Sequence, residues 1–125
     1  VALVDDSLIR GTNIRAVVKM LKEAGAREVH VRIASPPVMW PCFFGMDFQT
    51  RRELAAYARS VEAVRHLVGA DTLAYLPLDK FRQILGGAVC YACFTGEYPM
   101  AIDVEEAERE LARAPPSRRL AETGL

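Results

Sequence analysis

The chain has 125 residues, of which 51% are hydrophobic and 26% charged, and 16 Lys and Arg balance 16 Asp and Glu. This is the composition of one folded domain rather than of a disordered or fibrous chain. The balanced charge gives no reason to expect nucleic acid as a partner, and no apolar run reaches the ~20 residues of a membrane helix.

The first elements predicted are a strand, a helix and a second strand. Residues 1–4 form an apolar run without alternation, which is typical of a strand covered on both faces in a parallel sheet. Apolar residues then recur at helical spacing, predicting a helix over 12–24 that Gly25 is suited to end. Residues 28–34 alternate between polar and apolar as far as the break at Pro36, which predicts the next strand. The order is that of a βαβ unit.

The remaining elements are shorter and separated by loops. Residues 38–47 contain too many Pro, Gly and aromatic residues for a regular element, so we expect a packed loop. Thr50 and Glu53 have the spacing of a capping box, which predicts a helix over 50–59. The later predictions are a helix over 60–68 closed by Gly69, a strand over 71–76, a helix over 77–85, a loop over 90–93, a charged helix over 104–113 and a disordered tail.

The link between the first strand and the first helix carries the strongest chemical signal. Such links are where open α/β sheets bind ligands. Backbone N–H groups and the helix dipole favour a phosphate there, Gly11 permits its close approach, and the hydroxyls of Ser7 and Thr12 can donate to it. The carboxylates of Asp5 and Asp6 would repel a phosphate, so they must serve another part of the same ligand. A ribose diol or a magnesium ion fits that role, whereas a simple helix cap explains only a single Asp.

The stretch DDSLIRGT, residues 5–12, resembles the phosphoribosyl pyrophosphate (PRPP) motif of type I phosphoribosyltransferases. The resemblance implies an α/β fold with a Rossmann-like parallel sheet. It also implies that Asp5 and Asp6 contact the ribose hydroxyls and the associated Mg²⁺. The residues it implies around the 5′-phosphate are Ser7, Leu8, Ile9, Arg10, Gly11 and Thr12.

Further stretches resemble one family that carries this motif, the glutamine PRPP amidotransferases, in their carboxyl-terminal part. They are EAGAREVHVRIASPP (23–37), WPCFFGMD (40–47), VGADTLAYLPLD (68–79) and CYACFTGEYP (90–99). The resemblance makes residues 1–100 the carboxyl-terminal part of a phosphoribosyltransferase domain with a cluster-binding segment. It leaves residues 101–125 as a helix followed by the tail.

The resemblance implies the first committed reaction of purine synthesis, in which PRPP, glutamine and water give 5-phosphoribosylamine, glutamate and pyrophosphate. In the family, an amino-terminal cysteine releases ammonia from glutamine, and Val1 cannot be that residue. We therefore expect a fragment that is inactive alone. The implied partners are PRPP, glutamine and inhibitory purine nucleotides, in a homo-oligomer without nucleic acid or membrane. The first residues do not resemble a secretory signal, so a cytoplasmic location is expected.

Three cysteines, Cys42, Cys90 and Cys93, form an odd set that suits a reducing compartment better than a disulfide framework. From the C-x-x-C spacing alone, an iron–sulfur site is no more favoured than the alternative of two buried small side chains or a zinc knuckle. The resemblance to the cluster-bearing branch of the family implies that all three bind a [4Fe-4S] cluster, with a fourth cysteine located upstream.

Two other functions remain open from the sequence. A phosphoribosyltransferase-like regulator would sense PRPP through the same loop without catalysis, although the DNA-binding segment expected to accompany it is not visible. A small metal-binding interaction module would depend on the cysteines, and the Asp pair would then be unimportant.

Overall fold

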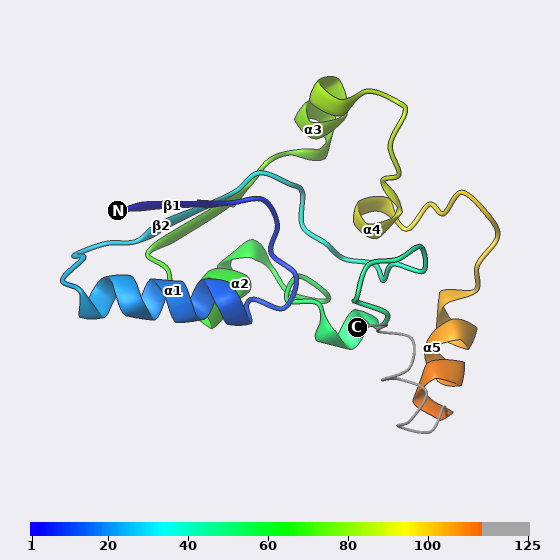
Figure 1. Ribbon diagram of the computed structural model, residues 1–125, viewed down its shortest axis with the longest axis horizontal. Coiled ribbons are helices and arrows are strands. Elements are labelled where there is room, and N and C mark those ends of the chain that lie inside the picture. Colours follow the sequence, from blue (N-terminus) through cyan, green and yellow to red (C-terminus); the bar gives the residue numbers. More distant parts are fainter. Residues whose placement is uncertain (114–125) are drawn as a thin grey trace.

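The computed structural model describes residues 1–113 and forms a three-stranded parallel sheet with two helices on one face (Figure 1). In the described part of the chain no helix is long and apolar enough to span a membrane. The elements are β1 (Ala2–Asp5), α1 (Thr12–Glu23), β2 (His30–Ile33), a 3₁₀ turn η1 (Arg51–Glu53), α2 (Val61–Val68), β3 (Thr72–Tyr75), α3 (Leu78–Leu85), α4 (Ala92–Thr95) and α5 (Val104–Arg113).

The sheet confirms the predicted βαβ unit. Its strand order is β1-β2-β3, and both neighbouring pairs are parallel. Val4, Arg32 and Ala74 lie side by side across the three strands. Helix α1 connects β1 to β2 and α2 leads into β3, so the carboxyl ends of all three strands meet at one edge of the sheet.

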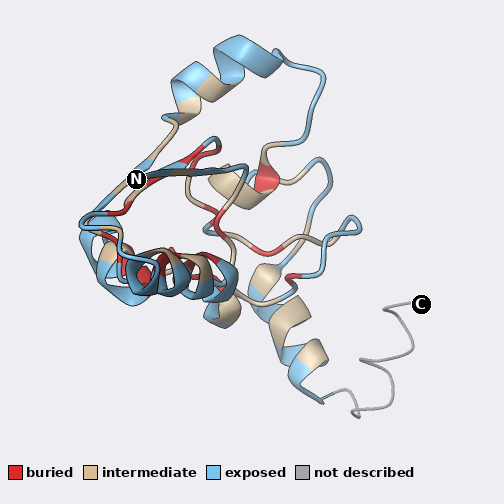
Figure 2. Ribbon diagram, turned by 60° about the vertical axis from the view of Figure 1, so that its left-hand side comes forward, coloured by how far each residue is buried: buried red, intermediate tan, exposed pale blue. Residues whose placement is uncertain are grey.

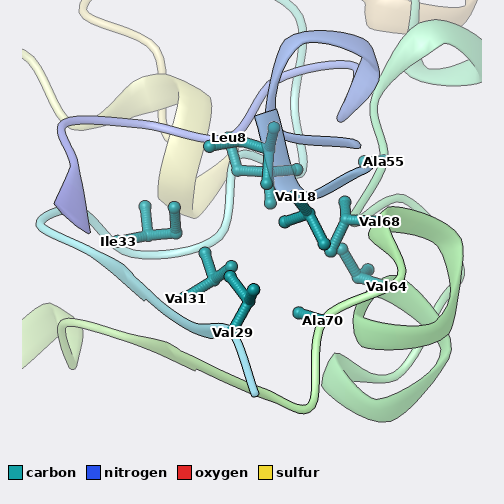
Figure 3. Close-up of a cluster of buried hydrophobic side chains, with 10 residues drawn as sticks. Leu8, Val18, Val29, Val31, Ile33, Ala55, Val64, Val68 and Ala70 are labelled. Atoms are coloured by element: carbon teal, nitrogen blue, oxygen red, sulfur yellow. The ribbon is translucent and has the colours of Figure 1, made fainter. Parts of the chain in front are cut away.

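The core lies between the sheet and the helices α1 and α2. Val31 and Ile33 alternate with polar residues along β2 and point toward the helices. They meet Val18 of α1 and Val68 of α2 in one buried cluster, and the loop residue Leu8 joins it (Figure 3). Burying such side chains contributes about 1.5–3 kcal/mol each, so this cluster fixes the position of α1 under the sheet.

The first strand was expected to be covered on both faces, and this prediction is wrong for the described residues. Strand β1 is an edge strand, and the side chain of Val4 is 69% exposed. The reason is that α1 and α2 cover only one face of a narrow sheet, so residues of β1 that face away from them have no cover (Figure 2).

The prediction of a helix over residues 50–59 is also wrong, although the predicted capping box at its start is correct. The Thr50 N–H donates to the Glu53 carboxylate at 3.0 Å, as a capping box requires, but only the 3₁₀ turn η1 follows. The chain becomes extended at Leu54, whose side chain is 0% exposed. The next N–H, of Ala55, donates to the carbonyl of Ile9 at 2.7 Å. Tertiary burial and this long-range bond therefore prevail over local helix propensity.

The segment around the last two cysteines was expected to be a loop, but Cys93 lies within the short helix α4. The carbonyl of Tyr91 accepts the N–H groups of Phe94 and Thr95, which closes the turn. Cys93 and Phe94 pack against a second, smaller core cluster, whose buried members are Val38, Phe48 and Leu54.

The charged helix predicted over 104–113 is confirmed as α5. It has no buried residue and is held by an ion pair in which Glu108 accepts from the Arg51 guanidinium at 2.9 Å and from the Arg51 N–H at 2.6 Å. The predicted tail lies outside the described residues.

Candidate functional site

A pocket of about 350 Å³ lies at the carboxyl end of β1, lined by residues 5–14. One uninterrupted stretch of chain therefore forms it: the end of the strand, the connecting loop and the first turn of α1. All eight residues predicted to bind PRPP, Asp5 to Thr12, line this pocket, and the three predicted cysteine ligands do not. Asn13 and Ile14 line it too, and sequence reasoning missed them because it ended the site with the motif.

The loop that lines this pocket has unbonded backbone N–H groups. Within residues 1–113, the N–H groups from Ser7 to Ile14 find no hydrogen-bond acceptor, and the first helical bond runs from the Arg15 N–H to the Gly11 carbonyl. The amino end of α1 adds the positive end of the helix dipole. An anion in the pocket would satisfy these donors.

Gly11 sits at the N-cap of α1, where the chain turns sharply. Its φ of 79° lies in the left-handed region, and a Cβ atom there would be 3.3 Å from Val68 Cγ1. Glycine is therefore required for both its backbone conformation and its close packing against α2. The sequence had indicated glycine only for the approach of a ligand.

The carboxylates of Asp5 and Asp6 are exposed at the mouth of the pocket. Asp5 Oδ1 accepts the Asp6 N–H at 3.0 Å, and Asp6 Oδ1 accepts the Ser7 hydroxyl at 2.9 Å. The second oxygen of each carboxylate has no hydrogen bond within the described residues. Oxygen donors of this kind suit Mg²⁺ or the hydroxyls of a sugar, so the pair fits the implied ion.

Leu8 and Ile9 anchor the loop rather than offer side chains to a ligand. Leu8 is 1% exposed in the main core, and Ile9 packs against the second cluster. The Ile9 carbonyl also accepts the Ala55 N–H. These two residues can contribute to ligand binding only through their backbone.

The Arg10 guanidinium is engaged with neighbouring protein groups. Its Nε donates to Glu53 at 2.9 Å, and its Nη2 forms a second contact with the same carboxylate and donates to the Asp47 carbonyl at 2.6 Å. Burial raises the pKa of Glu53, but the bonds from Thr50 and Arg10 outweigh it and keep that pKa below its ordinary value. The sequence had indicated Glu53 only as a helix cap, and nothing local revealed its link to Arg10.

The three predicted cluster ligands come close to one another without forming a preformed site. Cys42 and Cys93 pack on the same apolar cluster, whereas Cys90 is exposed, and none is in a disulfide. Burial raises the pKa of Cys93 to about 11, and the nearby Cys42 and Cys90 contribute to the rise. Among residues 1–113, no three His, Cys, Asp or Glu side chains are spaced to hold a metal ion. Cys90 would therefore have to move toward Cys42 and Cys93 before the three thiols could hold a cluster.

A larger hollow, of about 630 Å³, lies elsewhere, between Trp40, Arg51 and residues 101–105. It is an open groove where α5 meets the body. Its lining combines Trp40 with Arg51, Asp103 and Glu105. Arg51 is already paired with Glu108, and Asp103 Oδ1 already accepts the Glu106 N–H at the start of α5, so few donors are left there for a phosphate. We therefore consider the smaller pocket at the end of β1 the candidate site.

Several known proteins are similar to this chain over most of its length. No family model matches the chain. It is 47% identical over 116 residues to the chloroplastic amidophosphoribosyltransferase of Glycine max, covering 90% of this chain and 20% of that protein. It is 52% identical over 100 residues to the amidophosphoribosyltransferase of Pyrococcus horikoshii, covering 79% of this chain and 22% of that protein.

Two solved structures have the same fold over most of the chain. The Bacillus subtilis glutamine PRPP amidotransferase complexed with ADP and GMP has a TM-score of 0.73 and 48% identity, covering 82% of this chain and 24% of that one. A structure described as the allosteric regulatory enzyme of purine biosynthesis has a TM-score of 0.73 and 47% identity, covering 82% of this chain and 23% of that one. The resemblance to glutamine PRPP amidotransferases and the α/β fold class are confirmed. The chain spans about a fifth to a quarter of these relatives.

Proposed function

We propose that this chain, a homologue of one segment of the amidophosphoribosyltransferases, binds PRPP with Mg²⁺ in the pocket at the end of β1. The observation that carries the proposal is that one stretch, residues 5–14, lines a pocket with exposed carboxylates at its mouth and unbonded N–H groups at the start of α1. The N–H groups can donate hydrogen bonds to a phosphate, and the carboxylates can bind the hydroxyls of a ribose or a magnesium ion.

Each end of the loop has its own role in this proposal. The backbone N–H groups from Ser7 onward and the Thr12 hydroxyl hold the 5′-phosphate, while Asp5 and Asp6 orient the ribose. The Ser7 hydroxyl joins the phosphate donors once its bond to Asp6 Oδ1 breaks. Magnesium, when bound, neutralises charge on the pyrophosphate. Because the loop is fixed by Leu8 and Gly11, the ribose is presented in one orientation, and positioning is a large part of what catalysis requires.

The whole reaction belongs to a longer protein in this proposal. Ammonia released from glutamine displaces pyrophosphate from carbon 1 of PRPP, so that a C–N bond forms, the C–O bond breaks and 5-phosphoribosylamine results. Purine nucleotides are proposed as inhibitors, because one similar structure is complexed with ADP and GMP. A homo-oligomer in the cytoplasm remains the expectation. The 125-residue chain is expected to bind PRPP without turning it over.

Calorimetric titration of PRPP into the chain, with and without Mg²⁺, tests the site. Magnesium-dependent binding that is lost in Asp5→Ala and Asp6→Ala is expected. Asp79→Ala serves as the matched control, because that carboxylate is exposed in the first turn of α3, away from the pocket. Binding that survives both pocket substitutions would refute the proposal.

A second proposal concerns the cysteines. We propose that Cys42, Cys90 and Cys93 provide three ligands of a [4Fe-4S] cluster after Cys90 moves inward. Support comes from the family resemblance, from the packing of Cys42 and Cys93 on one cluster, and from the Phe44 N–H, which donates to the Cys42 sulfur at 3.4 Å. Hydrogen bonds to ligand sulfurs are common around such clusters.

Anaerobic reconstitution with iron, sulfide and an external thiol as the fourth ligand tests this second proposal. Bound iron and acid-labile sulfide, with the visible absorption of a cluster, are expected in the chain and should be lost in Cys42→Ser, Cys90→Ser and Cys93→Ser. Zinc binding alone, or no metal, would contradict the cluster and leave the PRPP proposal unaffected.

A further inference from the structure

The Arg10–Glu53 pair joins the candidate phosphate loop to a distant part of the chain. We propose that Glu53 is a positioning residue for this loop and that it acts through Arg10, whose charge is thereby withheld from the ligand. The inference rests on the proposed function, because it concerns how the loop that receives the PRPP phosphate is held.

Arg10 lines the pocket, but its guanidinium is held by Glu53 and Asp47, which do not line it. Two of its nitrogens donate to Glu53 Oε2, and Nη2 also donates to the Asp47 carbonyl. Asp47 Oδ2 lies 3.9 Å from the same nitrogen. For Arg10 to reach a phosphate, these contacts would have to break.

Glu53 is itself held in place by a second set of contacts. Its Oε1 accepts the Thr50 N–H at 3.0 Å and the Thr50 hydroxyl at 3.3 Å. Both carboxylate oxygens are therefore occupied, and the side chain is only 25% exposed. An exposed ion pair contributes little to stability, but this pair has several donors in a fixed geometry and can set the direction of Arg10.

The loop needs such external support because it has little of its own. No N–H from Ser7 to Ile14 finds an acceptor within the described residues, so the loop has no internal backbone bonds. The Ile9 carbonyl is held by the Ala55 N–H, and Arg10, the next residue, is held by Glu53. These two adjacent tethers lead to the segment that follows Thr50 and hold the backbone of the loop that lines the pocket.

Substitutions distinguish positioning from direct binding. If Arg10 were a phosphate ligand restrained by Glu53, Glu53→Gln would release it and leave binding unchanged or stronger. If Glu53 positions the loop through Arg10, then Glu53→Gln and Arg10→Gln weaken binding by a similar factor. The double substitution then weakens it no further, because both break the same tether.

Calorimetric titration of the chain with PRPP and Mg²⁺ measures these factors. We expect roughly tenfold weaker binding in Glu53→Gln, in Arg10→Gln and in the double variant, since small displacements of a positioned group are costly. The amide oxygen introduced by Glu53→Gln can still accept from Thr50, so the capping box persists. Glu108→Gln, which breaks the comparable pair with Arg51 beside α5, should leave the affinity unchanged.

Hydrogen exchange of the Ala55 and Arg15 amides, which donate to the loop carbonyls of Ile9 and Gly11, separates this inference from the proposed function when it is followed by NMR. Faster exchange in Glu53→Gln than in Glu108→Gln supports positioning, even if the unmodified chain fails to bind PRPP and the proposed function falls. If the unmodified chain binds PRPP and Glu53→Gln binds it equally tightly or more tightly, the inference is overturned and the proposed function stands. The inference is also overturned if the double variant loses as much affinity as the two single variants combined.

Discussion

The sheet with α1 and α2 and the segment from Ser35 to Tyr57 are stabilised in different ways. Ten buried residues form one cluster between the sheet and its helices, whereas the second cluster has three. The second region depends instead on long-range polar contacts, such as those from Glu53 to Arg10 and from Glu108 to Arg51. The loop that lines the pocket is therefore held in two ways: Leu8 is buried in the apolar cluster of the regular elements, and Arg10 forms polar contacts with an irregular segment.

The candidate site lies where the two regions meet. Leu8 belongs to the first cluster, and its neighbour Ile9 packs against the second. The loop can keep its shape only if both regions are folded. Changes that affect one region alone should therefore separate stability from ligand binding.

The largest expected effect comes from truncating one leucine in each region. Leu8→Ala and Leu54→Ala both remove a side chain that is at most 1% exposed, and each should cost about 3 kcal/mol locally. Leu8→Ala should lower the free energy of global unfolding in urea. Leu54→Ala should mainly accelerate amide exchange over 36–57, because few buried contacts connect that region to the rest. Equal loss of global stability would show that the two regions unfold as one unit.

The next effect concerns Gly11, which touches both regions. Gly11→Ala should cost about 2 kcal/mol, because a left-handed alanine is strained and its Cβ would crowd Val68. Gly25→Ala is the matched control: its φ of 97° is also positive, but nothing lies within 4 Å of its Cβ position. Urea denaturation should show the larger loss at Gly11, and calorimetry should show that only Gly11→Ala loses PRPP binding. Equal losses at the two glycines would mean that the contact with α2 is unimportant.

A pH titration tests the polar contacts of the second region. Burial raises the pKa of Glu108, but bonds from the Arg51 side chain and N–H outweigh it, so the pKa is lowered. The stabilisation is present above the ordinary pKa of the carboxyl and is lost as the pH falls through the lowered value. Fluorescence of Trp40, which the Arg51 guanidinium approaches to 5.9 Å, should report this acid transition. Glu108→Gln should abolish this acid transition and lower the free energy of unfolding by about 1 kcal/mol. If the transition persists in Glu108→Gln, another titrating group causes it.

The smallest effect is expected in the sheet itself. The Tyr75 hydroxyl is buried and has no hydrogen-bond partner among the described residues, and burial raises the pKa of Tyr75 to about 12. Tyr75→Phe should therefore stabilise the chain by about 0.5 kcal/mol in urea denaturation. A loss of stability would reveal a partner for this hydroxyl.

The sequence predicted the first region well because its signals are local. Helical spacing, the Ser60 cap and Gly69 correctly bounded the helices, and the position of the Asp5–Thr12 stretch between strand and helix located the pocket. The edge exposure of β1 could not be predicted, since it depends on what covers the sheet.

The second region was predicted less well because distant contacts decide it. The capping box of Thr50 and Glu53 was correct, but the burial of Leu54 and the bond from Ala55 to Ile9 end the turn after three residues. The pairing of Arg10 with Glu53 spans 43 positions and leaves no periodic pattern in the sequence. The sequence therefore pointed to the stretch that lines the pocket but not to the ion pair that holds Arg10.

The most direct test of the central claim is to follow backbone amide signals of the chain by NMR while PRPP and Mg²⁺ are added. The site proposed here predicts that the signals of residues 7–14 move, that they do so only with Mg²⁺, and that those of residues 101–105 beside the larger hollow remain in place. Movement confined to residues 101–105 and Trp40, or no movement at saturating ligand, would contradict the claim that the loop after β1 is the PRPP site.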